Sequence, residues 1–344
     1  MPRPEAAPIE LGIRRHTFSP DQRRILADYW HPVASSDKAP EGAMTTATLL
    51  DVDLVIYRLD GRVHVGVDYC PHRGARLSLG RVTGAGVMCG YHGMEFDRTG
   101  RCTLIPADTE NALISERLRM NMVAAEERYG LIWVCLSGEP RMPLPDWSAI
   151  EQPGNQRIAL GGVWEASALR HLENFCDLAH LTFVHGATFA APGQPHVAPY
   201  AVERRPHGLY FDVMVPMVDE QIFTADTRHI DVRTEYDVTF PFATRLTLHL
   251  SQGVEHICDV VSPVAAGRSE FFMLKSRDHD QDHSAEDWFA FQAAVNEEDR
   301  ALVESQTPDW PAFSQSNEVQ VGSDRFSVAF RKYWFDQGLG RDAG

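Results

Sequence analysis

Four residues in the first third of the chain are of the types that hold an iron–sulfur cluster. They are Cys70, His72, Cys89 and His92, in the order C-P-H, sixteen further residues, then C-G-Y-H. Because each cysteine is followed closely by a histidine, two thiolates can hold one iron and two imidazoles a second iron, across two bridging sulfides. Zinc also accepts two cysteines and two histidines, but zinc sites usually pair like with like along the chain. The mixed order therefore favours a [2Fe–2S] cluster over zinc or a chance group of core residues.

The flanks of these ligands resemble the Rieske family of iron–sulfur proteins. They read C-P-H-R-G-A over residues 70–75 and C-G-Y-H-G-M-E-F over residues 89–96. High-potential members carry an extra cysteine in each loop, where this chain has Ala75 and Tyr91. The resemblance therefore implies the low-potential type that serves oxygenases. Met94 replaces a tryptophan common in that type, and we expect the change to affect packing more than ligation.

A second group of chemically capable residues lies at 173–185, E-N-F-C-D-L-A-H-L-T-F-V-H. Asn174, Asp177 and His180 are three residues apart, so on a helix they would share one face. His185 lies five residues beyond His180 and needs a helix end or a π-type irregularity to reach the same point. Two histidines and a carboxylate with open positions are the ligands of non-haem Fe(II) oxygenases. The alternative is an amphipathic helix with hydrogen-bonded histidines.

The carboxylate ligand is expected from a helix late in the chain, over residues 285–306. Its apolar face is spaced as Trp288, Gln292, Val295, Asp299, Leu302 and Gln306. Asp299 would share that face and point inward, and a buried carboxylate is costly unless a cation lies beside it. Glu297 and Glu298 belong to the same acidic run, and Glu298 stays open as the alternative ligand.

Residues 173–185 match the N-x2-D-x2-H-x4-H signature of the Rieske non-haem iron oxygenases, and the resemblance extends over residues 30–334. It implies that His180, His185 and Asp299 hold Fe(II), and it gives catalytic roles to Asp177 and Asn174. Asp177 would orient His180 and meet His92 of a neighbouring subunit. Asn174 would hydrogen-bond near the iron or near Asp177, with a helix-surface amide as the alternative.

The same resemblance implies a terminal oxygenase component. It would use O2, and electrons from a separate NAD(P)H-dependent reductase and possibly a ferredoxin, to hydroxylate or oxidatively demethylate a small aromatic substrate. The N-x2-D spacing and the length are similar to the vanillate and dicamba demethylase branch rather than to ring-hydroxylating dioxygenases. A head-to-tail homotrimer with electron transfer between subunits is also implied. The rival functions are a Rieske electron carrier and a ligand-binding protein without oxygenase activity.

Composition limits the partners and the compartment. The net charge of −16 argues against binding nucleic acid or an acidic membrane. No apolar run approaches the length of a membrane span, and the N-terminus lacks an apolar signal core. We therefore expect a cytoplasmic protein, in which the four cysteines outside the cluster motif stay reduced.

The expected architecture is α+β with three parts. Residues 1–28 form an arm and a short helix, capped by Ser19 with Pro20 at its first position. Residues 29–145 form an antiparallel β Rieske domain, with strands at 46–57 and 62–67 and a turn at Asp60 and Gly61. Residues 146–344 form a helix-grip catalytic domain of the START/Bet v1-like type.

The sequence gives less detail about the substrate pocket. We expect its walls to come from strands between about residues 200 and 275 and from the two helices. The candidate wall residues are Phe223, Phe240, Phe242, Leu248 and His249. Each of them could equally belong to the core. The aromatic C-terminal stretch, residues 324–335, is expected to dock on its own domain.

Overall fold

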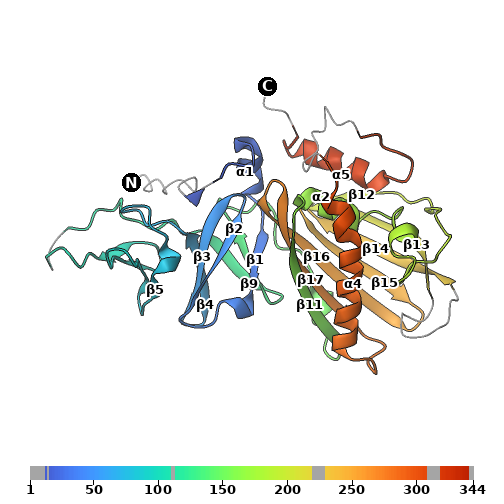
Figure 1. Ribbon diagram of the computed structural model, residues 1–344, viewed down its shortest axis with the longest axis horizontal. Coiled ribbons are helices and arrows are strands. Elements are labelled where there is room, and N and C mark those ends of the chain that lie inside the picture. Colours follow the sequence, from blue (N-terminus) through green and yellow to red (C-terminus); the bar gives the residue numbers. More distant parts are fainter. Residues whose placement is uncertain (1–11, 14, 110–112, 219–228, 308–317, 341–344) are drawn as a thin grey trace. The chain divides into compact units, whose positions relative to one another are not determined.

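A computed structural model describes residues 12–13, 15–109, 113–218, 229–307 and 318–340 (Figure 1). Most of the predicted N-terminal arm lies outside these residues. The chain divides into two compact units, 1–143 and 144–344. Within the described residues, no helix is long and apolar enough to cross a membrane. All six cysteines are described, and each is buried and free of a disulfide.

The first unit is built almost entirely from antiparallel β-structure. Its sheets have the strand orders β1-β10-β9, β2-β3-β4 and β5-β6-β7-β8. Its elements are α1 (Pro20–Leu26), β1 (His31–Ser35), η2 (Ser36–Lys38), β2 (Met44–Leu49), β3 (Val52–Leu59), β4 (Arg62–Val67), η3 (Leu77–Leu79), β5 (Arg81–Val82), β6 (Gly86–Met88), β7 (Glu95–Asp97), β8 (Cys102–Leu104), β9 (Ala124–Arg128) and β10 (Leu131–Cys135).

Two local predictions for this unit are confirmed: the cap of α1 and the turn between β3 and β4. The Ser19 side chain accepts a hydrogen bond from the Gln22 amide, and the Gln22 side chain accepts one from the Ser19 amide. This reciprocal cap, with Pro20 in the first turn, fixes the start of α1. Asp60 and Gly61 adopt positive φ angles of 53° and 72° and close the β3–β4 hairpin.

The predicted single strand over residues 46–57 is wrong, because the chain turns at Leu50 and Asp51 to form β2 and β3. Both residues have positive φ, 53° and 69°. Buried Asp51 accepts hydrogen bonds from Thr17 and pairs with Arg23 at 2.9 Å. These contacts come from residues about 30 positions away, so they leave no trace in the local alternation of apolar residues.

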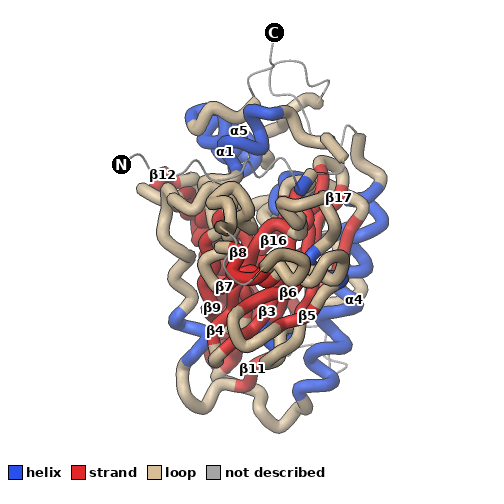
Figure 2. The backbone as a smooth tube through the Cα atoms, turned by 90° about the vertical axis from the view of Figure 1, so that its left-hand side faces the viewer, coloured by secondary structure: helices blue, strands red, loops and turns tan. Residues whose placement is uncertain are grey.

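The second unit is one antiparallel sheet with a long helix across it, and the predicted α+β helix-grip class is confirmed. The strand order is β11-β17-β16-β15-β14-β13-β12. Helix α4 runs alongside the sheet in both views and contacts β11 and α2 (Figures 1 and 2). The elements are η4 (Ser148–Glu151), β11 (Gln156–Trp164), α2 (Ala168–Phe175), α3 (Leu181–Val184), β12 (Glu203–Arg205), β13 (Gly208–Val218), β14 (His229–Thr239), β15 (Ala243–Leu250), β16 (Gly253–Ala265), β17 (Arg268–Arg277), α4 (Ala285–Glu304) and α5 (Arg325–Asp336).

Helix α5 docks on its own unit, as expected. It buries four aromatic side chains: Phe326, Phe330, Tyr333 and Trp334. The Trp334 ring centroid lies 5.4 Å from those of both Phe240 and Phe242. These two phenylalanines therefore belong to the core beneath α5 and not to a pocket wall, which corrects the prediction for them.

Candidate metal centres

The two loops that carry the first ligand set are built alike. Cys70 begins one loop after β4, and Cys89 begins the other between β6 and β7. In each loop, the amide of a glycine four residues on donates to the cysteine carbonyl: Gly74 to Cys70 at 2.8 Å and Gly93 to Cys89 at 3.0 Å. Both glycines have positive φ, about 70°, where only glycine is unstrained. The repeated Cys-to-Gly spacing was a sequence signal for this shared turn that the motif analysis missed.

The side chains of these loops fit an iron–sulfur cluster. Cys70 and Cys89 are each 2% exposed, and the His72 and His92 ring centroids lie 4.7 Å apart. His72 Nδ1 is buried without a hydrogen-bond partner among the described residues, which is unusual unless a ligand occupies the position. Burial and the neighbouring Cys89 raise the pKa of the Cys70 thiol to about 11, so a metal would have to displace its proton.

The second ligand set lies at a break between two helices, and the predicted shared helical face is wrong. Helix α2 ends after Phe175 with Cys176 as its C-cap. Asp177 then accepts a hydrogen bond from the Ala179 amide through Oδ1 at 2.9 Å, a side-chain turn that competes with the helix. His180 and His185 are the N-cap and C-cap of α3, so a helix end, rather than a π-type irregularity, accounts for their spacing.

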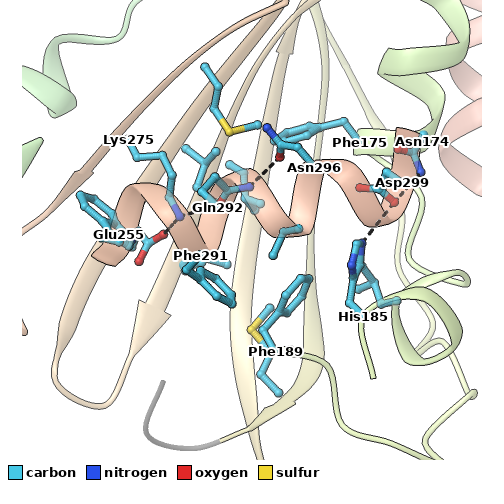
Figure 3. Close-up of a pocket in the computed structure, with 18 of the residues that line it drawn as sticks. Asn174, Phe175, His185, Phe189, Glu255, Lys275, Phe291, Gln292, Asn296 and Asp299 are labelled. Atoms are coloured by element: carbon cyan, nitrogen blue, oxygen red, sulfur yellow. Dashed lines mark hydrogen bonds and ion pairs between the residues drawn. The ribbon is translucent and has the colours of Figure 1, made fainter. Parts of the chain in front are cut away.

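Three side chains converge at this break, and Figure 3 shows two of them, His185 and Asp299, facing each other. Nε2 of His185 lies 3.2 Å, and Nε2 of His180 lies 3.4 Å, from Oδ1 of Asp299. One ligand atom from each of the three residues lies within 4.8 Å of the other two. Asn174, at the end of α2, donates from Nδ2 to the same Asp299 oxygen at 3.3 Å. Two imidazole nitrogens and a carboxylate oxygen so close together could hold a metal ion.

The opposite nitrogen of each imidazole contacts a second carboxylate. His180 Nδ1 lies 3.3 Å from Asp177 Oδ2, and His185 Nδ1 lies 2.7 Å from Glu298 Oε2. A carboxylate at Nδ1 holds the proton there and leaves the Nε2 lone pair for a metal. Thr188 donates to the same Glu298 oxygen at 3.1 Å and steadies it. The structure thus places Glu298 behind His185 and Asp299 at the convergence point.

Charge at the break also suits a divalent cation. Asp177, Glu298 and Asp299 bring three carboxylates to two imidazoles. Burial lowers the pKa of His185, but the hydrogen bonds and charges of Asp299 and Glu298 outweigh it and raise this pKa. Burial acts to raise the pKa of Asp177. The hydrogen bond and charge of His180 act in the opposite direction and outweigh burial, so the pKa of Asp177 is lowered. The surplus negative charge is what a bound cation would neutralise.

A pocket opens beside the three converging side chains. Among its residues are Phe175, Phe189, Met217, Leu246, Leu248, Ile257, Met273, Trp288, Phe291 and Val295. Of the predicted wall residues, Leu248 lines it, whereas His249 instead pairs with Glu235 at 2.6 Å. Phe223 lies outside the described residues. The wall is mostly apolar, so it would exclude water from a bound substrate.

The pocket also contains a polar group that was not predicted from the sequence. Lys275 on β17 and Glu255 on β16 form an ion pair of 2.7 Å, and both line the cavity. Burial lowers the pKa of Lys275, while Glu255 acts in the opposite direction. Charged residues in strands usually indicate a solvent-facing side, so the sequence offered no signal for this pair.

Comparisons with known proteins identify two domain families along the chain. The Rieske [2Fe-2S] domain model matches residues 29–120. The vanillate O-demethylase oxygenase C-terminal domain model matches residues 164–334. Methylxanthine N1-demethylase NdmA of Pseudomonas putida is 32% identical over 325 residues, 91% of this chain and 89% of that protein. Methylxanthine N3-demethylase NdmB of the same organism is also 32% identical, over 91% of this chain and 90% of that protein.

Solved structures show the same fold. NdmA from Pseudomonas putida CBB5 with caffeine superposes with a TM-score of 0.82 at 29% identity, covering 91% of each chain. Dicamba monooxygenase bound to dicamba has a TM-score of 0.77 at 20% identity, covering 91% of this chain and 97% of that one, a likeness of fold. Since curated relatives align over nine tenths of its length, this chain belongs to the Rieske non-haem iron oxygenases, enzymes that pair a Rieske [2Fe–2S] cluster with a mononuclear iron.

Proposed function

We propose that this chain is the terminal oxygenase of an oxidative demethylase, acting on a small planar substrate that carries an N- or O-methyl group. The observation that carries the proposal is the convergence of His180, His185 and Asp299 beside an apolar pocket. Relatives named for demethylation support it: NdmA and NdmB, and the vanillate O-demethylase oxygenase subunit of a Pseudomonas strain, 35% identical over 164 residues. Ring hydroxylation is the second candidate.

The residues divide the work between two metal groups. Cys70, His72, Cys89 and His92 would hold the cluster, and His180, His185 and Asp299 would hold Fe(II). When bound, the iron would activate O2 with electrons supplied through the cluster.

The surrounding residues position these ligands. Asp177 and Glu298 orient the two imidazoles, and Asn174 fixes the oxygen of Asp299 that both Nε2 atoms face. The apolar wall holds the substrate and keeps water away from it. These three orienting side chains account for the polar character of the break.

We propose that the electrons come from a separate reductase. The oxidoreductase NdmD of Pseudomonas putida is 38% identical over 123 residues, which are 35% of this chain and 21% of that protein. We propose that a reductase docks near the cluster loops, directly or through a ferredoxin. His92 is exposed there, while both cysteines are buried, so this imidazole offers a short path for electrons.

We also propose that the chain forms a homotrimer in which the cluster of one copy serves the iron of the next. Support comes from exposed aromatic residues beside each centre: Tyr91, 67% exposed, on a cluster loop, and Phe183, 77% exposed, on α3. The Asp177 side chain, which contacts His180, is 35% exposed and could accept a hydrogen bond from the His92 of another copy. Aromatic residues are enriched in protein–protein interfaces relative to the rest of the surface.

The assembly has a direct test. Phe183→Asp should dissociate the trimer in light scattering and abolish coupled turnover while both metal centres stay filled. Val328→Asp, at an exposed position on α5 that is 48% accessible, is the matched control and should change nothing. A wild-type monomer, or a Phe183→Asp trimer with full activity, would refute the proposed assembly.

Oxidative demethylation can be tested before the natural reductase is known. Holoenzyme is reduced chemically, mixed with a panel of N- and O-methylated ring compounds, and exposed to O2 for a single turnover. Formaldehyde released with the demethylated product supports the proposal, and His180→Ala should release none. A hydroxylated product that keeps its methyl group would favour the second candidate, and no product from any compound would count against both.

A further inference from the structure

A buried ion pair stands in the pocket at a distance from the iron ligands. The side chains of Lys275 and Glu255 are 2% and 4% exposed, and their charged atoms lie 2.7 Å apart. Lys275 also contacts the face of Trp288, with Nζ 4.9 Å from the ring centroid. Replacing a buried pair with apolar residues is often neutral or stabilising, so stability alone gives no reason for this one. A role in binding the substrate does.

The pair begins a chain of hydrogen bonds that runs along α4. Lys275 Nζ donates to Gln292 Oε1 at 2.6 Å, and Gln292 Nε2 donates to Asn296 Oδ1 at 2.8 Å (Figure 3). An ammonium group has only donors, so it fixes the Gln292 amide with its oxygen toward Lys275. The Gln292 nitrogen must then meet the Asn296 oxygen. Asn296, which lines the pocket, is left with its Nδ2 donors for a ligand.

Spacing on α4 relates these donors to the iron ligands. Asn296 precedes Asp299 by three residues and Gln292 precedes it by seven, which is roughly 4.5 and 10 Å along the helix axis. Figure 3 shows Asn174, His185 and Asp299 at one part of the pocket and Lys275, Glu255 and Gln292 at the other. A flat ring of one or two fused cycles would fill that interval, with its methyl group toward Asp299.

We propose that Lys275, Gln292 and Asn296 form a recognition site for a carbonyl oxygen, so that the substrate is an uncharged, planar N-methyl compound with a ring carbonyl. The inference rests on the proposed demethylation and names its substrate class. Lys275, Gln292 and Asn296 each keep N–H donors that these hydrogen bonds do not use, so the matching substrate group is an acceptor. Glu255 already balances the charge of Lys275, so a substrate carboxylate would bring a second, uncompensated negative charge into a buried site. Methoxybenzoates are therefore excluded.

The proposed carbonyl site is tested by measuring how tightly small-molecule probes bind to oxidised holoenzyme under anaerobic conditions, where no turnover occurs. The probes are 1-methyl-2-quinolone, its carbonyl-free counterpart 1-methylindole, and 4-methoxybenzoate, with dissociation constants from calorimetry. The wild type should bind the quinolone about tenfold or more tightly than 1-methylindole, the gain from one good buried hydrogen bond. It should bind the benzoate most weakly.

Variants separate the recognition site from the fold. Lys275→Met/Glu255→Leu removes the pair together and avoids an unpaired buried charge. It should keep iron and cluster content but lose the roughly tenfold preference for the quinolone. Glu255→Gln should instead gain affinity for 4-methoxybenzoate, since Lys275 is then unbalanced. Lys332→Met, at a lysine that is 75% exposed, is the control and should bind as the wild type does.

The outcomes distinguish this inference from the function on which it rests. Equal wild-type affinities for the three probes, or an unchanged preference in the double variant, would overturn the carbonyl site even if demethylation is observed. The predicted binding preference without any formaldehyde from bound quinolone would leave the carbonyl site standing and overturn the demethylase.

Discussion

The carboxylate that completes the iron site can be identified by comparing two neighbouring residues on α4. Asp299 faces the Nε2 atoms of both histidines, at 3.2 and 3.4 Å, whereas Glu298 contacts His185 through Nδ1, at 2.7 Å. We therefore expect Asp299→Ala to remove a metal ligand and Glu298→Ala to remove only a partner that orients a ligand.

The two substitutions should weaken iron binding by different amounts. Loss of a partner that orients a metal-binding histidine typically weakens metal affinity by about 10- to 100-fold, which corresponds to about 1.4 to 2.7 kcal/mol. The mononuclear site of the Glu298→Ala variant should therefore still fill with iron when the free Fe(II) concentration is raised about 10- to 100-fold. Asp299→Ala leaves two neutral imidazoles without an anionic ligand, so the content should fall from about three irons to about two per two sulfides.

The assay is iron and acid-labile sulfide per chain on anaerobically purified protein, followed by dialysis against buffered Fe(II). Glu297→Ala is the matched control, because Glu297 belongs to the same acidic run and its side chain is 66% exposed. The visible spectrum of the cluster should be unchanged in all three variants. Retention of the third iron in Asp299→Ala together with its loss in Glu298→Ala would refute the assignment drawn from these distances.

Three further predictions follow from other parts of the structure. Asp177→Asn should keep both metal centres, because the amide oxygen can still accept from His180, but lower coupled turnover by about 10- to 100-fold, because no second carboxylate oxygen is left for His92 of another copy; a normal rate of product formation would contradict this. Asp51→Asn should lower the free energy of unfolding at pH 7 by about 3 kcal/mol, because Arg23 loses a buried partner. Burial acts to raise the pKa of Asp51, but hydrogen bonds from Thr17 and Arg23 outweigh it and lower this pKa. The stabilisation is therefore present above the unfolded-state pKa and lost as pH falls through the lower folded value, so wild type and variant should converge below about pH 4 in denaturant titrations. Trp334→Ala should cost about 3 to 5 kcal/mol in the same assay, whereas Val328→Ala, at an exposed position, should cost little.

The sequence by itself indicated which residues we propose as metal ligands, because that information is local. Each cluster loop carries its cysteine, histidine and turn glycine within a few positions, and the cap of α1 lies within Ser19, Pro20 and Gln22. Hydrogen bonds over so few residues depend little on the rest of the chain. The two ligand motifs and the α+β class could therefore be predicted from the residues alone.

Features that depend on contacts between residues far apart in the sequence were decided only by the tertiary structure. The turn at Leu50 and Asp51 is held by Thr17 and Arg23, and it interrupts a pattern that predicted one strand. The break after α2 forms because the Asp177 side chain caps the Ala179 amide, an alternative that the helical spacing of the motif does not reveal.

The division of roles between Glu298 and Asp299 is a tertiary property as well. Adjacent residues on a helix point about 100° apart, so the packing of α4 decides which one faces the Nε2 atoms of the two histidines. The pair of Lys275 and Glu255 arises in the same way, from two neighbouring strands whose buried faces meet α4. The sequence supplies the ligands, and contacts between residues far apart in the chain assign their partners and shape the pocket.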